Sequence, residues 1–160
     1  MSAEGLTLKG TLKVEFAKFG ELYIAKARVE GNMELTEVRL EENIYAERLV
    51  LGGDLRLNGV LVRDRLSFEG AQVGGKFEAE DIGGEISASG MQIGKGLIWK
   101  KIKAGTVDLK GTRVGEELAI ASLTGDKWES DEMTVVGKAS IKGVRILGGF
   151  SWKRGKVSGR

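Results

Sequence analysis

The apolar residues of this chain recur at two alternating intervals, a pattern too sustained for chance and too widely spaced for a helix. Intervals of 11, 9, 11, 9, 12 and 9 residues separate Val62, Val73, Ile82, Ile93, Ile102, Val114 and Leu123. Adding neighbouring intervals gives a repeat of 20 or 21 residues. A repeat of this length is typical of architectures in which each unit buries its apolar side against the next unit.

A pair of apolar residues, two positions apart, accompanies each of these intervals. The pairs are Leu55/Leu57, Leu66/Phe68, Phe77/Ala79, Ile86/Ala88, Leu97/Trp99, Val107/Leu109 and Leu118/Ile120. Because successive side chains of a strand point to opposite faces, each pair predicts a strand of a few residues with one buried face. The residue between the two is polar in most pairs, as expected of a half-buried strand.

The content of glycine and proline favours strands that are paired on both sides. The chain has 25 Gly and no Pro. Glycine permits turns that need a positive φ, and the glycine pairs at 52–53, 74–75, 83–84 and 148–149 are predicted corners. Proline would remove a ladder hydrogen bond wherever a strand has two neighbours, so its absence suits a structure with few edges.

An antiparallel sandwich with glycine-containing turns is the main alternative fold. Such sandwiches favour Asn-Gly and Asp-Gly turns, and Asn58-Gly59 is the only such dipeptide in the sequence. Helix is expected at most as an end cap, because no glycine-free window has amphipathic spacing. We therefore predict an all-β fold, a single-stranded parallel β-helix (β-solenoid) of about seven coils of 20–22 residues, which spans residues 1–160 as one domain.

The pattern is interrupted between residues 124 and 131, which are mostly polar and include turn formers. We expect this segment to be a loop inserted into one coil. Trp128 lies within it, and we expect its side chain to cover the base of the loop. The alternative for Trp128 is an exposed anchor for a partner.

Stacking at an offset of 20 residues predicts which side chains are neighbours in adjacent coils. The outer pairs are Glu80 with Lys100, Asp81 with Lys101 and Arg65 with Glu85, and the inner pairs are Phe77 with Leu97 and Ala79 with Trp99. Trp99 is accordingly expected in the core. Exposed pairs of opposite charge each contribute under about 1 kcal/mol, but their signs disfavour a shifted register.

Composition removes several kinds of active site. The chain has no Cys and no His, which excludes disulfides, thiolate metal sites and the commonest general base. We therefore expect no catalytic residue, no cofactor and no metal. Four acidic residues lie close together in sequence, and we expect a solvated face paired with lysines rather than Ca²⁺ ligands: Glu78, Glu80, Asp81 and Glu85.

Charge and hydropathy indicate where such a chain would act. The 25 basic and 23 acidic residues give a formal charge of +2, which makes no strong case for nucleic acid. No run of 18 apolar residues and no signal peptide is evident, so we expect a cytoplasmic protein with no transmembrane segment. The 30% of charged residues is typical of a thermophile.

Two segments, residues 66–77 (LSFEGAQVGGKF) and 84–94 (GEISASGMQIG), resemble the units of right-handed parallel β-helix repeat families. The repeat length is similar to that of pentapeptide-repeat proteins. Residues 43–53 (NIYAERLVLGG) resemble bactofilins, cytoskeletal proteins that polymerise end to end. The resemblance implies a right-handed coil and, through the bactofilins, self-association.

The expected function is that of a non-enzymatic structural or scaffolding protein. Because the repeat continues toward both termini without an evident cap, we expect the protein to bind itself through solenoid ends or faces, as a homo-oligomer or filament. The alternatives are a monomeric module that presents an outer β face to a protein or polysaccharide and, third, a carbohydrate-active β-helix enzyme. The candidate interaction residues are Trp128, Lys100, Lys101, Lys103, Trp152 and Arg154.

Overall fold

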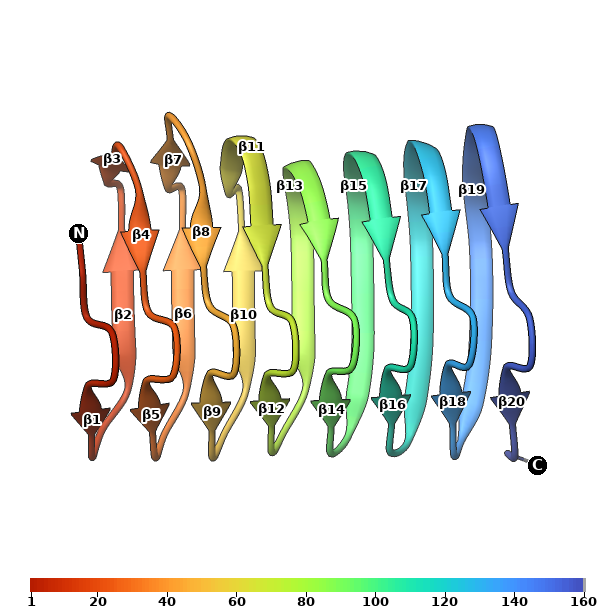
Figure 1. The fold of residues 1–160 in the computed structure, drawn as a ribbon, viewed down its shortest axis with the longest axis horizontal. Helices are drawn as coiled ribbons and strands as arrows, with labels where there is room; N and C mark the ends of the chain where they lie inside the picture. The colour runs from red at the N-terminus through yellow and green to blue at the C-terminus, as the bar shows by residue number, and fades with distance from the viewer. Residues whose placement is uncertain (160) are drawn as a thin grey trace.

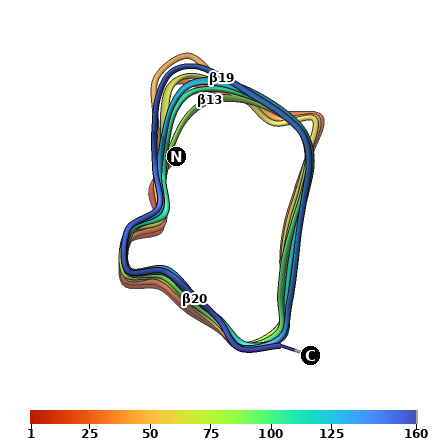
Figure 2. The same cartoon turned by 90° about the vertical axis from the view of Figure 1, so that its right-hand side faces the viewer.

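The chain forms a parallel β-solenoid of about seven turns (Figure 1). The structure is a computed structural model that describes residues 1–159, in which the regular elements are all strands and every strand pairing is parallel. Viewed end on, the coils superimpose in one closed outline (Figure 2). The predicted all-β solenoid is confirmed.

One wall of the solenoid is an eight-stranded sheet to which each coil contributes a strand of two residues. Its strands, in spatial order, are β1 (Thr7–Leu8), β5 (Arg28–Val29), β9 (Val50–Leu51), β12 (Gln72–Val73), β14 (Gln92–Ile93), β16 (Arg113–Val114), β18 (Thr134–Val135) and β20 (Lys156–Val157). Eight strands in one row are separated by seven steps, which gives the number of turns.

The remainder of each coil belongs to a twelve-stranded sheet. In the N-terminal coils its strands are short: β2 (Leu12–Glu15), β3 (Lys18–Phe19), β4 (Leu22–Tyr23), β6 (Met33–Thr36), β7 (Arg39–Leu40), β8 (Ile44–Tyr45), β10 (Leu55–Asn58) and β11 (Leu61–Ser67). In the later coils they merge into β13 (Phe77–Ser87), β15 (Gly96–Asp108), β17 (Glu117–Glu129) and β19 (Lys138–Ser151). These merged strands have 11 to 14 residues, more than the few predicted, because one strand continues around a corner of the coil.

The two alternating sequence intervals correspond to the two sheets. Val73, Ile93 and Val114 are direct neighbours in the eight-stranded sheet. Ile82, Ile102 and Leu123 are direct neighbours in the twelve-stranded sheet, and all six side chains are buried. Since each coil passes once through each sheet, the apolar beat marks the two walls of the core.

Most of the predicted stacking register is confirmed. The ladder pairs Glu80 with Lys100, Arg65 with Glu85, Phe77 with Leu97, and Ala79 with Trp99. The offset of 20 residues is local, since equivalent residues are 22 apart between β6, β10 and β13 and 21 apart between β15, β17 and β19. Asp81 and Lys101 both adopt a left-handed φ at the bend, and the Lys101 ammonium instead pairs with Glu80 at 3.2 Å.

Two columns of left-handed residues turn the chain at fixed places in every coil. Their φ angles lie between +50° and +66°, and they recur every 20–22 positions. One column contains Phe16, Glu37, Gly59, Asp81, Lys101, Ser122 and Gly143, and the other contains Gly5, Lys26, Arg48, Gly70, Gly90, Gly111, Glu132 and Arg154. Since this conformation costs an L-residue roughly 1–2 kcal/mol, the stacked neighbours on both sides must impose it.

A further column of glycines allows close approach between coils at the predicted corners after the eight-stranded sheet. A Cβ built on Gly52, Gly74, Gly94 or Gly115 would lie only 2.0 to 2.4 Å from a carbonyl oxygen of the preceding coil. No side chain fits there, which explains the glycine. The predicted corners at 83–84 and 148–149 lie inside the merged strands β13 and β19.

Aromatic side chains fill the middle of the core. Trp99 is fully buried, as predicted, and packs edge to face on Phe77 with ring centroids 5.4 Å apart. The predicted loop at 124–131 is wrong, because residues 124–129 continue β17. Trp128 is 1% exposed inside the coil, and its Nε1–H donates to the Ser130 hydroxyl at 2.7 Å.

Candidate functional site

The three lysines predicted to interact with a partner lie together on the outer side of β15. Lys100, Lys101 and Lys103 are all exposed. Lys100 neighbours Glu80 in the ladder, and Lys101 pairs with the same carboxylate. Glu80 thus offsets part of the positive charge, and the surface is a charged flank in the middle of the solenoid.

The other predicted residues are placed elsewhere. Trp128 is inside the core and has no exposed surface to offer a partner. Trp152 and Arg154 follow β19 in the last coil; Trp152 packs partly against the core, and the Arg154 guanidinium pairs with Glu132. The structure therefore does not bring the six candidates into one site, but it directs attention to the C-terminal coil.

The C-terminal end of the solenoid exposes side chains that are core residues in every other coil. Phe150 is 59% exposed, although the residues it stacks upon, Val107 and Trp128, are fully buried. Ile141 is likewise exposed above buried Ile120. Within residues 1–159, no element covers these side chains, so the core of the solenoid is open at this end.

Strand β19 also leaves one backbone edge unpaired among the described residues. It has 14 residues and pairs with β17 alone in the twelve-stranded sheet. Unpaired edges of this length form a template for another strand, and proteins usually blunt them. Ile141, Leu147 and Phe150 add exposed apolar surface to the same strand. We name this surface, formed by β19, β20 and the intervening residues, the C-terminal end.

The charge of the C-terminal end is entirely of one sign. Residues 138–159 contain six basic side chains and no acidic one: Lys138, Lys142, Arg145, Lys153, Arg154 and Lys156. The chain as a whole is nearly balanced, so this coil departs strongly from the average. Two such surfaces brought face to face would repel each other.

The opposite end of the solenoid is also apolar but has mixed charge. Leu8, Leu12, Val14 and Phe19 are only partly buried there, and Phe16 is 80% exposed at the bend after β2. Residues 1–21 contain Lys9, Lys13, Lys18, Glu4, Glu15 and Glu21. We name this surface, formed by residues 1–21, the N-terminal end. It lies at the other extremity of the long axis from the C-terminal end (Figure 1).

A carboxylate pair adds negative charge beside the N-terminal end. The Glu21 carboxylate, through a hydrogen bond and charge repulsion, raises the pKa of Glu42 above its ordinary value. Asp64 in the next coil acts in the same direction. This flank therefore carries concentrated negative charge, in contrast to the uniformly positive C-terminal end.

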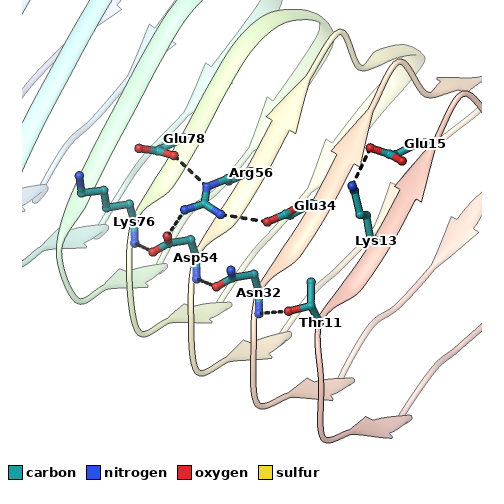
Figure 3. A network of polar contacts seen from close by, with 9 residues as sticks. All are labelled: Thr11, Lys13, Glu15, Asn32, Glu34, Asp54, Arg56, Lys76 and Glu78. Atoms are coloured by element: carbon teal, nitrogen blue, oxygen red, sulfur yellow. Dashed lines mark hydrogen bonds and ion pairs between the residues drawn. The ribbon is translucent and has the colours of Figure 1, made fainter.

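The acidic residues on the long outer face are neutralised by arginine and do not form a reactive cluster. Arg56 binds three carboxylates, with Nη1 to Glu34 at 2.9 Å, Nη2 to Asp54 at 2.6 Å and Nε to Glu78 at 3.1 Å (Figure 3). Among the described residues, no group of three or more Asp or Glu side chains is arranged to hold a metal ion. The prediction that Glu78 faces lysines is wrong, since its partner is Arg56, one coil earlier.

Side chains also replace backbone bonds at the corner beneath this network. The amide N–H of Asp54 donates to Asn32 Oδ1 at 2.8 Å, and that of Lys76 donates to Asp54 Oδ1 at 2.8 Å. Thr11 occupies the same position in the first coil (Figure 3). These contacts bind each coil to the next and explain the network as structural.

Sequence reasoning did not identify Ile141 and Phe150 as exposed, because their pattern is that of core residues. Their position in the last coil was the available signal. Among residues 1–159 there is no helix of the length and hydropathy needed to cross a bilayer. Comparisons of the chain with protein-family models, curated proteins and solved structures gave no match.

Proposed function

We propose that this protein is a non-enzymatic structural protein that self-associates end to end. The observation that carries the proposal is the C-terminal end, where core side chains such as Phe150 are exposed beside the free edge of β19. Burial of these side chains under another coil would remove apolar surface from water and satisfy the strand edge. The resemblance to bactofilins, which polymerise, supports the same function.

The charges favour one polarity of association. A C-terminal end placed on a second C-terminal end would oppose six basic side chains to six others. The N-terminal end is apolar, has three glutamates, and lies beside the Glu21–Glu42 pair. We therefore expect head-to-tail contacts. A repeated head-to-tail contact whose rotation does not close a ring produces an open filament.

The test blocks each end separately. In Phe150→Arg the C-terminal end carries a bulky charge, and in Val14→Arg the N-terminal end does. Leu61→Arg is the matched control, because Leu61 is an exposed apolar residue on the side of the solenoid. Sedimentation velocity measures the size of the particles, and electron microscopy shows whether wild type forms filaments.

Head-to-tail association predicts that each blocked variant is monomeric alone and that a mixture of the two forms a dimer through the two unblocked ends. Leu61→Arg should assemble like wild type. A Phe150→Arg protein that still dimerises by itself would show contacts between N-terminal ends and refute the polarity. A strictly monomeric wild type at high concentration would refute self-association altogether.

A further inference from the structure

Two tyrosines from adjacent coils form a short aromatic stack on the outer surface. The ladder places Tyr23 of β4 beside Tyr45 of β8, and their rings stack with centroids 4.4 Å apart and planes 13° apart. This separation is close to the ~4.8 Å between neighbouring strands, so the ring planes lie across the solenoid axis. One face of Tyr45 therefore rests on Tyr23, and the other face points to the next coil.

The next coil leaves space above Tyr45. Its residue in register with Tyr45 is Ser67, and the following one is Ser87, both too small to continue the stack. A hollow of about 290 Å³ or less would hold one ring, and the hollow bounded by Tyr45, Ser67, Glu47, Arg65 and Glu69 measures ≈ 280 Å³. Since drug-sized ligands occupy ≈ 300–1,000 Å³, this volume suits a single small ring.

Hydrogen bonds hold the walls of the hollow in place without a ligand. Asn43 Nδ2 donates to the Tyr45 hydroxyl at 3.0 Å, and Asn43 Oδ1 accepts from the amide N–H of Arg65 at 3.1 Å. The Ser87 hydroxyl donates to Glu69 Oε1 at 2.6 Å. The aromatic face and one carboxylate are therefore oriented before anything binds, which lowers the entropic cost of binding.

The chemistry around the hollow selects among small rings. The Glu47 and Glu69 carboxylates accept hydrogen bonds, and the Arg65 guanidinium donates them. Two negative charges and one positive charge disfavour anions such as phosphate, and Arg65 disfavours an organic cation. The remaining class is a neutral ring with an apolar face for Tyr45 and hydroxyl groups around its edge for the charged side chains.

We propose that this hollow binds a neutral pyranose residue, seated on the free face of Tyr45, with its hydroxyl groups bound by Glu47, Glu69 and Arg65. This site lies on the side of the solenoid and is independent of the end-to-end contacts proposed above. It gives the protein a way to bind saccharide while it assembles. A single ring contact corresponds to a dissociation constant on the order of 1–10 mM.

The experiment is a titration of ¹⁵N-labelled protein with the methyl glycosides of glucose, galactose, mannose and N-acetylglucosamine, followed by amide chemical shifts. At least one glycoside should shift the amides of Tyr45, Ser67 and Glu69 in a saturable way. Tyr45→Ala should weaken binding at least about tenfold, since one aromatic contact contributes ~1 kcal/mol or more. Tyr45→Phe keeps the ring and should bind within a few-fold of wild type.

Ser67→Tyr is the sharper variant, because it extends the stack by one ring and fills the hollow without removing a wall. It should abolish the shifts and leave the circular dichroism spectrum unchanged. Phe150→Arg should bind the glycoside as wild type does, which separates this proposal from the assembly proposal. The proposal is overturned if no glycoside shifts these amides, if Ser67→Tyr still binds, or if inorganic phosphate produces the same shifts.

Discussion

Two glycines of one coil separate the steric from the conformational requirement for glycine, and we predict that they respond very differently to alanine. At Gly94 a Cβ would lie 2.3 Å from the carbonyl oxygen of Gly74, whereas its φ is not left-handed. At Gly90 the φ is +66°, but a Cβ would meet nothing within 4 Å. Gly94→Ala therefore tests close packing of coils, and Gly90→Ala tests backbone conformation alone.

The expected cost at Gly94 follows from the bonds that a Cβ would stretch. The amide of Gly94 donates to Val73 at 2.8 Å, and that of Lys95 donates to Gly75 at 3.0 Å. Relieving the contact requires the coils to separate locally by roughly 0.7 Å, which takes both bonds beyond hydrogen-bonding distance. The loss of two buried backbone bonds costs about 2–5 kcal/mol, or roughly 5–15 °C in Tm for a chain of this size.

Gly90→Ala should cost less. The left-handed conformation costs an alanine about 1–2 kcal/mol, and the reduced freedom of the unfolded chain offsets about 0.4–1 kcal/mol of that. Urea unfolding followed by far-UV circular dichroism measures both free energies. If Gly90→Ala destabilised the protein as much as Gly94→Ala, or if Gly94→Ala unfolded like wild type, the assignment of Gly94 to steric contact would be refuted.

Two further predictions concern the core and the pH dependence of stability. Trp99 Nε1 is buried without a hydrogen-bond partner, whereas Trp128 Nε1 donates to Ser130, so Trp99→Phe should change the free energy of unfolding by less than Trp128→Phe, which is expected to cost about 1–3 kcal/mol; urea unfolding of both variants decides, and the reverse order would contradict it. The Ser151 hydroxyl and the Lys153 amide hold the pKa of Asp131 below its ordinary value of 3.8, so its contribution is present above that value and lost as the pH falls through the lower folded pKa. Asp131→Asn should therefore lose less stability than wild type when urea midpoints at about pH 7 and about pH 3 are compared, and parallel losses would show that Asp131 is not linked to folding.

The sequence predicted the fold because the core alternates with strict regularity through most of the chain. Val73, Ile93 and Val114 are apolar at equivalent positions, so the repeat could be recognised without a structure. The register followed from opposite charges, and the ladder indeed places Glu80 beside Lys100. Periodic burial and cross-strand charge are both local signals that one chain displays in full.

The sequence failed where an inward position carries no large apolar side chain. Gly125 and Ser130 occupy such positions in and after β17, and they made a strand resemble a loop. The structure shows that Trp128 fills the space between them and that Ser130 accepts its N–H. Compensation between neighbouring coils is a property of the stack, and no single repeat reveals it.

The Tyr23–Tyr45 stack was missed for a different reason. Both residues follow a buried apolar residue, Leu22 and Ile44, and they are 22 positions apart. The offset of 20 taken from the middle of the chain does not align them. An offset that varied along the chain would have placed the two rings together.

Stacking in near-identical layers makes the length of this molecule independent of its cross-section. Leu97 and Leu118 occupy equivalent positions one coil apart, so a gene that lost or duplicated the 21 codons between them would keep every inward residue inward. Each such event changes the length of the rod by ~4.8 Å and creates no new type of contact. Duplications in the N-terminal coils need 22 codons instead, because equivalent residues there are 22 apart. The protein is therefore a ruler whose graduations are written in its reading frame, and length can evolve without redesign of the fold.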